Sequence, residues 1–180
     1  ATDAISDVLW TPSPDADENL AREGTDPGRV TRVGNIMMDS FELMRERIEQ
    51  ANTPAQFGLN KGNYGVVTMH RPSNVDDKAK LETIVGELIK AQGQLPIIFP
   101  VHPRTRKQLE QFSLWDEVQG LDQLILTEPL SYLPFMSLVL HAKFVLTDSG
   151  GIQEETTYLD IPCLTLRDNT ERPITLTQGT

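Results

Sequence analysis

The sequence predicts an α/β protein built on a Rossmann-like parallel sheet flanked by helices. Short apolar runs alternate along the chain with amphipathic stretches, and the connections between them are short. This alternation is typical of βαβ units. Polar residues directly follow several of the apolar runs, which is the position expected for a ligand site at the carboxyl edge of a parallel sheet.

The first part of the chain contains few elements. Residues 5–11 and 30–33 have the pattern of strands, and residues 14–23 have the pattern of a helix. So few elements cannot bury a hydrophobic core of their own, because the buried fraction of a domain grows with its size. We therefore expect a domain boundary between Gly34 and Gly62.

The second part opens with a helix that Asp39 is expected to cap and Pro54 to end. Its apolar side chains follow helical spacing at Phe41, Met44, Ile48 and Ala51. The clearest helical pattern of the chain starts at Asp76 and Asp77 and closes at Gly93. Its apolar stripe is formed by Leu81, Ile84, Val85, Leu88 and Ile89. Together these helices can cover a sheet.

The strands of that sheet are expected where the apolar runs lie. They cover residues 64–69, 95–101, 124–127, 144–147 and 163–166. Two further helices are expected, one from Tyr132 to His141 and one beginning at Ile152. These elements are enough for a Rossmann-like domain.

Composition excludes several classes of partner. A net charge of -10 and a pI near 4.7 argue against binding to nucleic acid or to an anionic membrane. No apolar run approaches the roughly 20 residues that a membrane span needs, and the first residues lack a signal-peptide pattern. The single cysteine, Cys163, cannot form an internal disulfide, which fits a reducing, cytoplasmic setting. The chain also lacks an initial methionine and ends abruptly, so we expect it to be part of a longer protein.

The most informative motif is the run from Thr147 to Glu155. An apolar strand stops at Ser149-Gly150-Gly151 and a helix follows. Glycines let a phosphate approach the backbone amides at the helix N-terminus, and the helix dipole favours the anion. Glu155 lies one turn into the helix, where it can accept hydrogen bonds from ribose hydroxyls. The motif therefore indicates a nucleotide diphosphate site; a plain βα turn with an N-cap serine is the alternative.

Histidines follow two of the predicted strands. His70 and Arg71 come after one strand and His102 after the next, so each can act on a phosphate or a proton at the sheet edge. Loop histidines that merely cover the edge are the alternative. His141 lies in the last turn of a helix, where a positive charge suits the dipole, and is expected to be structural. No spacing of these histidines or of cysteine pairs indicates a metal.

The segment after the last strand is dense in charge. Arg167 and Arg172 can clamp a phosphate or position neighbouring acids. An exposed loop of ion pairs is the alternative.

In order and spacing, these motifs resemble the non-hydrolysing UDP-N-acetylglucosamine 2-epimerases over essentially the whole chain. The matching segments are Val33-Gly34-Asn35 with Asp39, residues 68–71 with Asn74, residues 100–103, 128–130 and 147–155, Pro162, residues 167–173 and Gly179-Thr180. The resemblance implies the C-terminal half of a two-domain, GT-B-like fold whose active site lies in the cleft. Residues 1–35 would end the N-terminal domain, and residues 36–180 would form most of the C-terminal domain, truncated at its C-terminus.

The resemblance also implies the chemistry. Family enzymes interconvert UDP-GlcNAc and UDP-ManNAc by eliminating UDP and adding it back after proton exchange at C2, with no redox cofactor and no metal. His70 and Arg71 would be catalytic. The residues expected to bind substrate are Ser149, Gly150 and Gly151 at the diphosphate, Glu155 at the ribose, Phe135 near the uracil, and His102, Glu171 and Arg172 in the cleft. A homodimer is expected for the longer protein.

Two features set limits on this resemblance. Many bacterial members have an Arg-Glu pair where this chain has Pro72-Ser73, so we do not expect allosteric activation by UDP-GlcNAc here. The carboxylates that act at C2 lie in the N-terminal half of the family, outside this sequence. Two rival functions therefore remain: a glycosyltransferase of the same fold that uses a UDP-sugar, and a UDP-binding fragment without catalysis.

Overall fold

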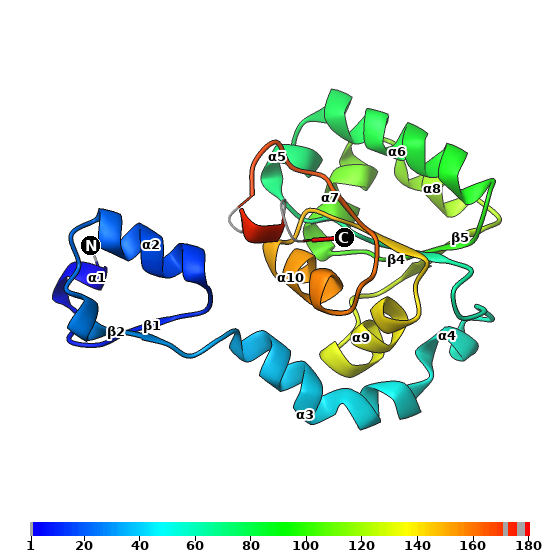
Figure 1. Ribbon diagram of the computed structural model, residues 1–180. Coiled ribbons are helices and arrows are strands. Elements are labelled where there is room, and N and C mark those ends of the chain that lie inside the picture. The colour runs from blue at the N-terminus through cyan, green and yellow to red at the C-terminus, as the bar shows by residue number, and fades with distance from the viewer. Residues whose placement is uncertain (1, 171–172, 176–178) are drawn as a thin grey trace. The chain divides into compact units, whose positions relative to one another are not determined.

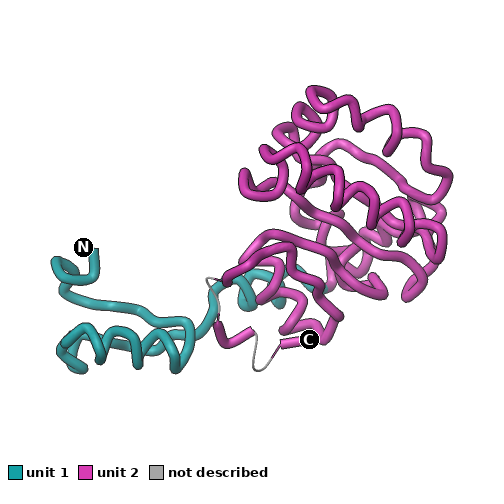
Figure 2. Tube along the Cα trace, turned by 90° about the horizontal axis from the view of Figure 1, so that it is seen from above, with its two compact units in different colours: residues 1–45 teal, residues 46–180 magenta. Residues whose placement is uncertain are grey.

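The computed structural model describes residues 2–170, 173–175 and 179–180. Two compact units make up the chain, residues 1–45 and residues 46–180 (Figure 2). None of the helices among the described residues is both long enough and apolar enough to cross a membrane.

The smaller unit contains a two-stranded parallel sheet. Strands β1 (Leu9–Thr11) and β2 (Val30–Arg32) pair in register, and between them lie α2 (Pro14–Arg22) and a 3₁₀ turn, η1 (Pro27–Arg29). The strand predicted over residues 5–11 begins only at Leu9, because α1 (Thr2–Ile5) forms a helical turn first.

Helix α3 (Ile36–Ala51) begins earlier than its apolar spacing suggests. The side chain of Asn35 accepts a hydrogen bond from the backbone N–H of Met37 at 3.0 Å, so Asn35 caps the helix. The prediction that Asp39 is the cap is therefore wrong, and Asp39 lies in the first turn. Pro54 does not end α3; it lies within the next short helix, α4 (Thr53–Gln56).

The larger unit is organised around five parallel strands in the order β5-β4-β3-β6-β7. Their bounds are β3 Gly65–Thr68, β4 Ile97–Pro100, β5 Leu124–Thr127, β6 Phe144–Thr147 and β7 Cys163–Thr165. After β3, the strands β4 and β5 follow in order toward one edge of the sheet. The chain then crosses back, and β6 pairs with the other side of β3. The predicted parallel α/β fold is confirmed, and its topological switch point lies between β3 and β6.

Helices cover both faces of this sheet (Figure 1). On one face are α5 (Pro72–Val75), α6 (Lys78–Gln92), α7 (Pro103–Gln111) and α8 (Trp115–Gln119); on the other are α9 (Tyr132–Leu140) and α10 (Gly150–Tyr158). The apolar stripe predicted on α6 is buried at Leu81, Ile84, Val85 and Leu88. As expected, an aspartate caps this helix: the side chain of Asp77 accepts from the N–H of Lys80 at 2.9 Å.

Candidate functional site

The switch point brings two polar turns together. Thr68, the last residue of β3, pairs with Thr147, the last residue of β6, and their hydroxyl oxygens are 2.7 Å apart. His70 and Arg71 follow the first of these strands, and Asp148 follows the second. The candidate site is therefore built where open parallel sheets bind ligands.

Asp148 connects the two turns. Its side chain is fully buried. It accepts hydrogen bonds from the backbone N–H of His70 at 2.9 Å, from the backbone N–H of Arg71 at 2.7 Å and from the side-chain amide of Asn74 at 3.2 Å. The Nδ1 atom of His70 lies 2.9 Å from the other carboxylate oxygen. The sequence alone indicated no role for Asp148, although a carboxylate directly after an apolar strand was a usable signal.

His70 also borders a pocket. The pocket has a volume of about 160 Å³ and is lined by Thr68, Met69, His70, Pro100, His102, Pro129, Leu130 and Phe135. It therefore brings together three predicted site residues, namely His70, His102 and Phe135. The rings of the two histidines are 5.6 Å apart, measured between centroids.

His102 has a structural task as well. It caps α7, and its Nδ1 atom accepts a hydrogen bond from the N–H of Arg104 at 3.2 Å. Acceptance at Nδ1 leaves Nε2 as the nitrogen that can carry the proton of a neutral ring. His102 thus combines the role of helix cap, which sequence analysis did not foresee, with a position on the pocket wall.

The Ser-Gly-Gly turn forms the start of α10. Ser149 is the N-cap residue, but its side chain makes no capping hydrogen bond, and the helix begins at Gly150 rather than at Ile152. The amide groups of the first helical turn have no partner within the helix, so they remain suited to an anion. The backbone N–H of Ser149 donates to the hydroxyl of Thr147 at 3.0 Å, which fixes the turn to the end of β6.

Glu155 lies one turn along the same helix, on the face of Gly151. Only 4% of its surface is exposed. Burial raises the pKa of the Glu155 carboxyl to about 7, although a hydrogen bond from Tyr132 opposes the shift. Burial also raises the pKa of Tyr132 to about 12. The site thus holds a carboxyl group in low-dielectric surroundings, where hydrogen bonds from ligand hydroxyls would stabilise its charged form.

Of the other residues singled out from the sequence, the structure describes Arg167 and His141. Glu171 and Arg172 lie outside the described residues. Arg167 donates to the side chain of Asn169 at 3.2 Å. His141 ends α9 as expected, but burial and nearby Lys61 lower its pKa, so the positive charge predicted for it is disfavoured. Over the described part of the chain, no cluster of three His, Cys, Asp or Glu side chains forms a metal-binding arrangement.

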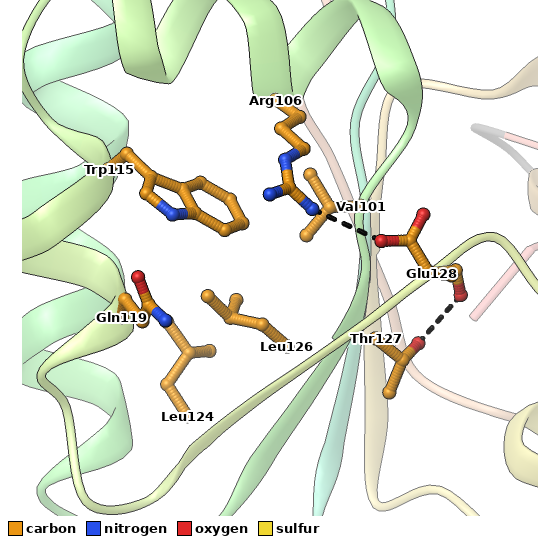
Figure 3. Close-up of a pocket in the computed structure, with 8 residues that line it drawn as sticks. All are labelled: Val101, Arg106, Trp115, Gln119, Leu124, Leu126, Thr127 and Glu128. Atoms are coloured by element: carbon orange, nitrogen blue, oxygen red, sulfur yellow. Dashed lines mark hydrogen bonds and ion pairs between the residues drawn. The ribbon is translucent and has the colours of Figure 1, made fainter.

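A larger pocket of about 420 Å³ lies beside the edge strand β5 and is lined by Val101, Arg106, Trp115, Gln119, Leu124, Leu126, Thr127 and Glu128 (Figure 3). Arg106 lies on the wall of this pocket, and its guanidinium stacks 4.6 Å from the centre of the Trp115 ring. The same group forms ion pairs with Glu110 at 3.0 Å and with Glu128 at 3.1 Å. Two negative charges therefore face one positive charge here. Among the described residues, the predicted His70, His102 and Phe135 line the smaller pocket rather than this one, so the smaller pocket is the candidate site.

Comparison with known proteins decides the family. A family model described as UDP-N-acetylglucosamine 2-epimerase matches residues 1–180. The chain belongs to this family. A UDP-N-acetylglucosamine 2-epimerase homolog of Methanococcus maripaludis is 42% identical over 180 residues, which are 99% of this chain and 50% of that protein.

Solved structures of the family agree in fold. The UDP-GlcNAc 2-epimerase of Methanocaldococcus jannaschii, in complex with UDP-GlcNAc and UDP, is 41% identical with a TM-score of 0.87; the match covers 98% of this chain and 49% of that one. The enzyme of Neisseria meningitidis bound to UDP-GlcNAc is 29% identical with a TM-score of 0.84 over 98% and 48%. This chain therefore spans about half the length of the relatives that it matches.

Proposed function

We propose that this chain is the nucleotide-binding half of a UDP-GlcNAc 2-epimerase. The observation that carries the proposal is the geometry at the switch point. Asp148 binds His70 at the end of β3 and directly precedes Ser149, the residue before the glycines that start α10. The buried Glu155 lies one turn further along α10. A site with these parts can bind a nucleotide diphosphate and act on the bond to its phosphate.

The nucleotide would occupy the surface around the start of α10. Gly150 and Gly151 present backbone amides to the diphosphate, and Ser149, whose backbone N–H is bound to Thr147, contributes its side-chain hydroxyl. Glu155 accepts hydrogen bonds from the ribose hydroxyls, and Phe135 lies near the uracil. Because the chain carries a net charge of -10, the attraction for UDP must come from these local amides and from a few arginines rather than from the overall field.

The reacting bond would lie near His70. In the elimination step the C2 proton leaves, the bond between C1 and the phosphate oxygen breaks, and a double bond forms between C1 and C2. His70 would stabilise the departing phosphate, with Arg71 beside it. His102 lines the same pocket, and Glu171 and Arg172 would complete the cleft. Re-addition of UDP after a proton returns to the other face of C2 gives the epimer.

The domain assignment follows the same proposal. Residues 1–35 would end the N-terminal domain, and residues 36–180 would belong to the C-terminal domain that grips UDP. The carboxylates that remove and return the C2 proton would come from the N-terminal domain of a protein as long as the relatives. We also propose that this protein is a cytoplasmic homodimer.

Allosteric activation by UDP-GlcNAc is not part of the proposal. Pro72 starts α5 and Ser73 follows within it, so neither position supplies the charged contact of an Arg-Glu pair.

Incubation of the full-length protein with UDP-GlcNAc alone tests the function. We expect UDP-ManNAc to form without any acceptor. A glycosyltransferase would leave the nucleotide sugar unchanged until an acceptor is added, and a protein that only binds UDP would show no product with or without one. Either of these results would contradict the proposal.

A further inference from the structure

The two carboxylate oxygens of Asp148 share the backbone N–H of His70 and otherwise have different partners. Oδ2 accepts from the backbone N–H of His70 and of Arg71 and from the side-chain amide of Asn74, at 2.9, 2.7 and 3.2 Å. Oδ1 faces Nδ1 of His70 at 2.9 Å and is 3.2 Å from the backbone N–H of the same residue. One oxygen is therefore held by three fixed donors, while the other is directed at the imidazole.

This arrangement determines which nitrogen of His70 carries a proton. An ionised carboxylate can only accept hydrogen bonds, so the Nδ1 atom that faces Oδ1 must donate. In a neutral ring the proton is then on Nδ1, and Nε2 keeps its lone pair. The ring borders the 160 Å³ pocket and lies 5.6 Å from the ring of His102, so Nε2 is the nitrogen left for a ligand.

We propose that Asp148 is a positioning residue that locks His70 in the Nδ1–H tautomer and in one orientation. With Nδ1 bound to the carboxylate, Nε2 is the nitrogen available to accept a proton and, once protonated, to donate it toward a phosphate oxygen. The tautomer follows from the geometry alone. Its catalytic consequence rests on the proposed function, in which His70 acts on the departing UDP.

A purely structural role for Asp148 is the competing explanation, because the same hydrogen bonds tie residues 70–74 to the end of β6. Asp148→Asn separates the two. In this variant the three donors that face Oδ2 need an acceptor, so the amide oxygen of the asparagine takes that position. The amide NH₂ group then occupies the position of Oδ1 and faces Nδ1 of His70. A donor in that position moves the imidazole proton to Nε2. In Ser-His-Asp triads the corresponding exchange lowers kcat by about 10⁴-fold through the wrong tautomer.

The first measurement is ¹⁵N NMR of the histidine rings in the complete 180-residue chain, at a pH where the rings are neutral. The sequence contains three histidines, and the signals of His70 are identified as those that disappear from the spectrum of His70→Asn. We expect Nδ1–H in the unmodified chain, Nε2–H in Asp148→Asn, and no change in Asp122→Asn, which alters an exposed aspartate. An Nε2–H tautomer in the unmodified chain would overturn the proposal even if Asp148→Asn fails to fold.

The second measurement is steady-state kinetics of Asp148→Asn in the full-length enzyme. We expect kcat to fall by about 10²–10⁴-fold, while KM changes less than kcat. A loss of kcat with an unchanged tautomer would mean that Asp148 only supports the loop, and an unchanged kcat would mean that the tautomer is irrelevant. If the unmodified enzyme shows the expected tautomer but no epimerisation, the proposed function fails and the tautomer assignment stands.

Discussion

Burial and ligand binding have opposite effects on the charge of Glu155. Its burial disfavours the charged carboxylate, yet a carboxylate is the stronger acceptor for ribose hydroxyls. A ligand that donates hydrogen bonds to the charged form would offset part of the cost of burial. The residue is thus suited to a partner with paired hydroxyl groups.

Replacing Glu155 by Gln should weaken UDP binding. The substitution keeps the shape but exchanges a charged acceptor for a neutral amide, and a hydrogen bond to a charged group contributes about 1.5–3 kcal/mol. We expect the Kd for UDP to rise on the order of tenfold or more, measured by calorimetric titration of the full-length protein. Glu117→Gln, on the exposed side of α8, is the matched control. An unchanged Kd in folded Glu155→Gln would remove the ribose role.

The same residue should make stability depend on pH. Its pKa is about 7 in the folded chain and near 4.5 when unfolded, so the folded state binds more protons between these values. The free energy of unfolding should therefore fall as pH rises from about 4.5 to 7 and stay lower above that range. Glu155→Gln removes this loss, which is at most about 3 kcal/mol. Urea unfolding should show a clearly larger gain from the substitution at pH 8 than at pH 5. Equal effects at both values would contradict the raised pKa.

His70 should matter for turnover more than for stability. Its side chain is 41% exposed, so His70→Asn removes little buried contact. We expect kcat to fall by about 10²–10⁴-fold with a modest change in the Kd for UDP, from kinetics and titration of the full-length enzyme. A parallel loss of UDP binding and of thermal stability would instead show that the histidine only maintains the sheet edge.

At the scale of elements, caps decide where helices begin. Asp77 caps α6 through the N–H of Lys80, so Asp77→Ala should lower the free energy of unfolding by about 0.5–2 kcal/mol. Asp122→Ala, in an exposed turn, should change it by less than about 0.5 kcal/mol. Urea denaturation of both variants measures the difference. Equal effects would show that the capping bond contributes nothing.

The sequence predicted the long periodic elements and missed the short ones. All five strands of the larger unit lie within the predicted apolar runs, because buried strands need continuous apolar residues. Helices α5 and α8 escaped prediction because segments as short as Pro72–Val75 and Trp115–Gln119 show too few turns for a periodic signal. Helix α7 is longer, but Leu109 is the one aliphatic residue in its sequence, so it shows no apolar stripe. The start of α3 was misplaced because Asn35, rather than the acidic Asp39, supplies the cap.

The sequence identified candidate residues in local motifs but not the contacts that join them. A strand followed by Ser-Gly-Gly and a glutamate is a local signal that one sequence can show. The contact of Asp148 with His70 joins residues 78 positions apart, so it depends on β6 returning beside β3. The Tyr132 contact with Glu155 likewise depends on the packing of α9 against α10, which local patterns do not specify.

At the scale of the whole molecule, the chain should bind but not turn over. The switch point carries Ser149, Glu155 and His70, whereas the proposed mechanism takes its proton-transferring carboxylates from the N-terminal domain. The smaller unit also exposes large apolar side chains, with Ile5 85% and Trp10 75% accessible. We expect the isolated 180-residue chain to bind UDP weakly, to self-associate in sedimentation experiments, and to show no epimerisation. Turnover by this chain, free of full-length enzyme, would contradict the division of roles.

The most direct test of the central claim is proton exchange at C2. The full-length protein is incubated with UDP-GlcNAc in D₂O without acceptor, and the sugars are analysed by NMR and mass spectrometry. The proposed elimination and re-addition require deuterium at C2 in the UDP-ManNAc product. UDP-ManNAc without deuterium, or no UDP-ManNAc at all from a folded protein that binds UDP, would contradict it.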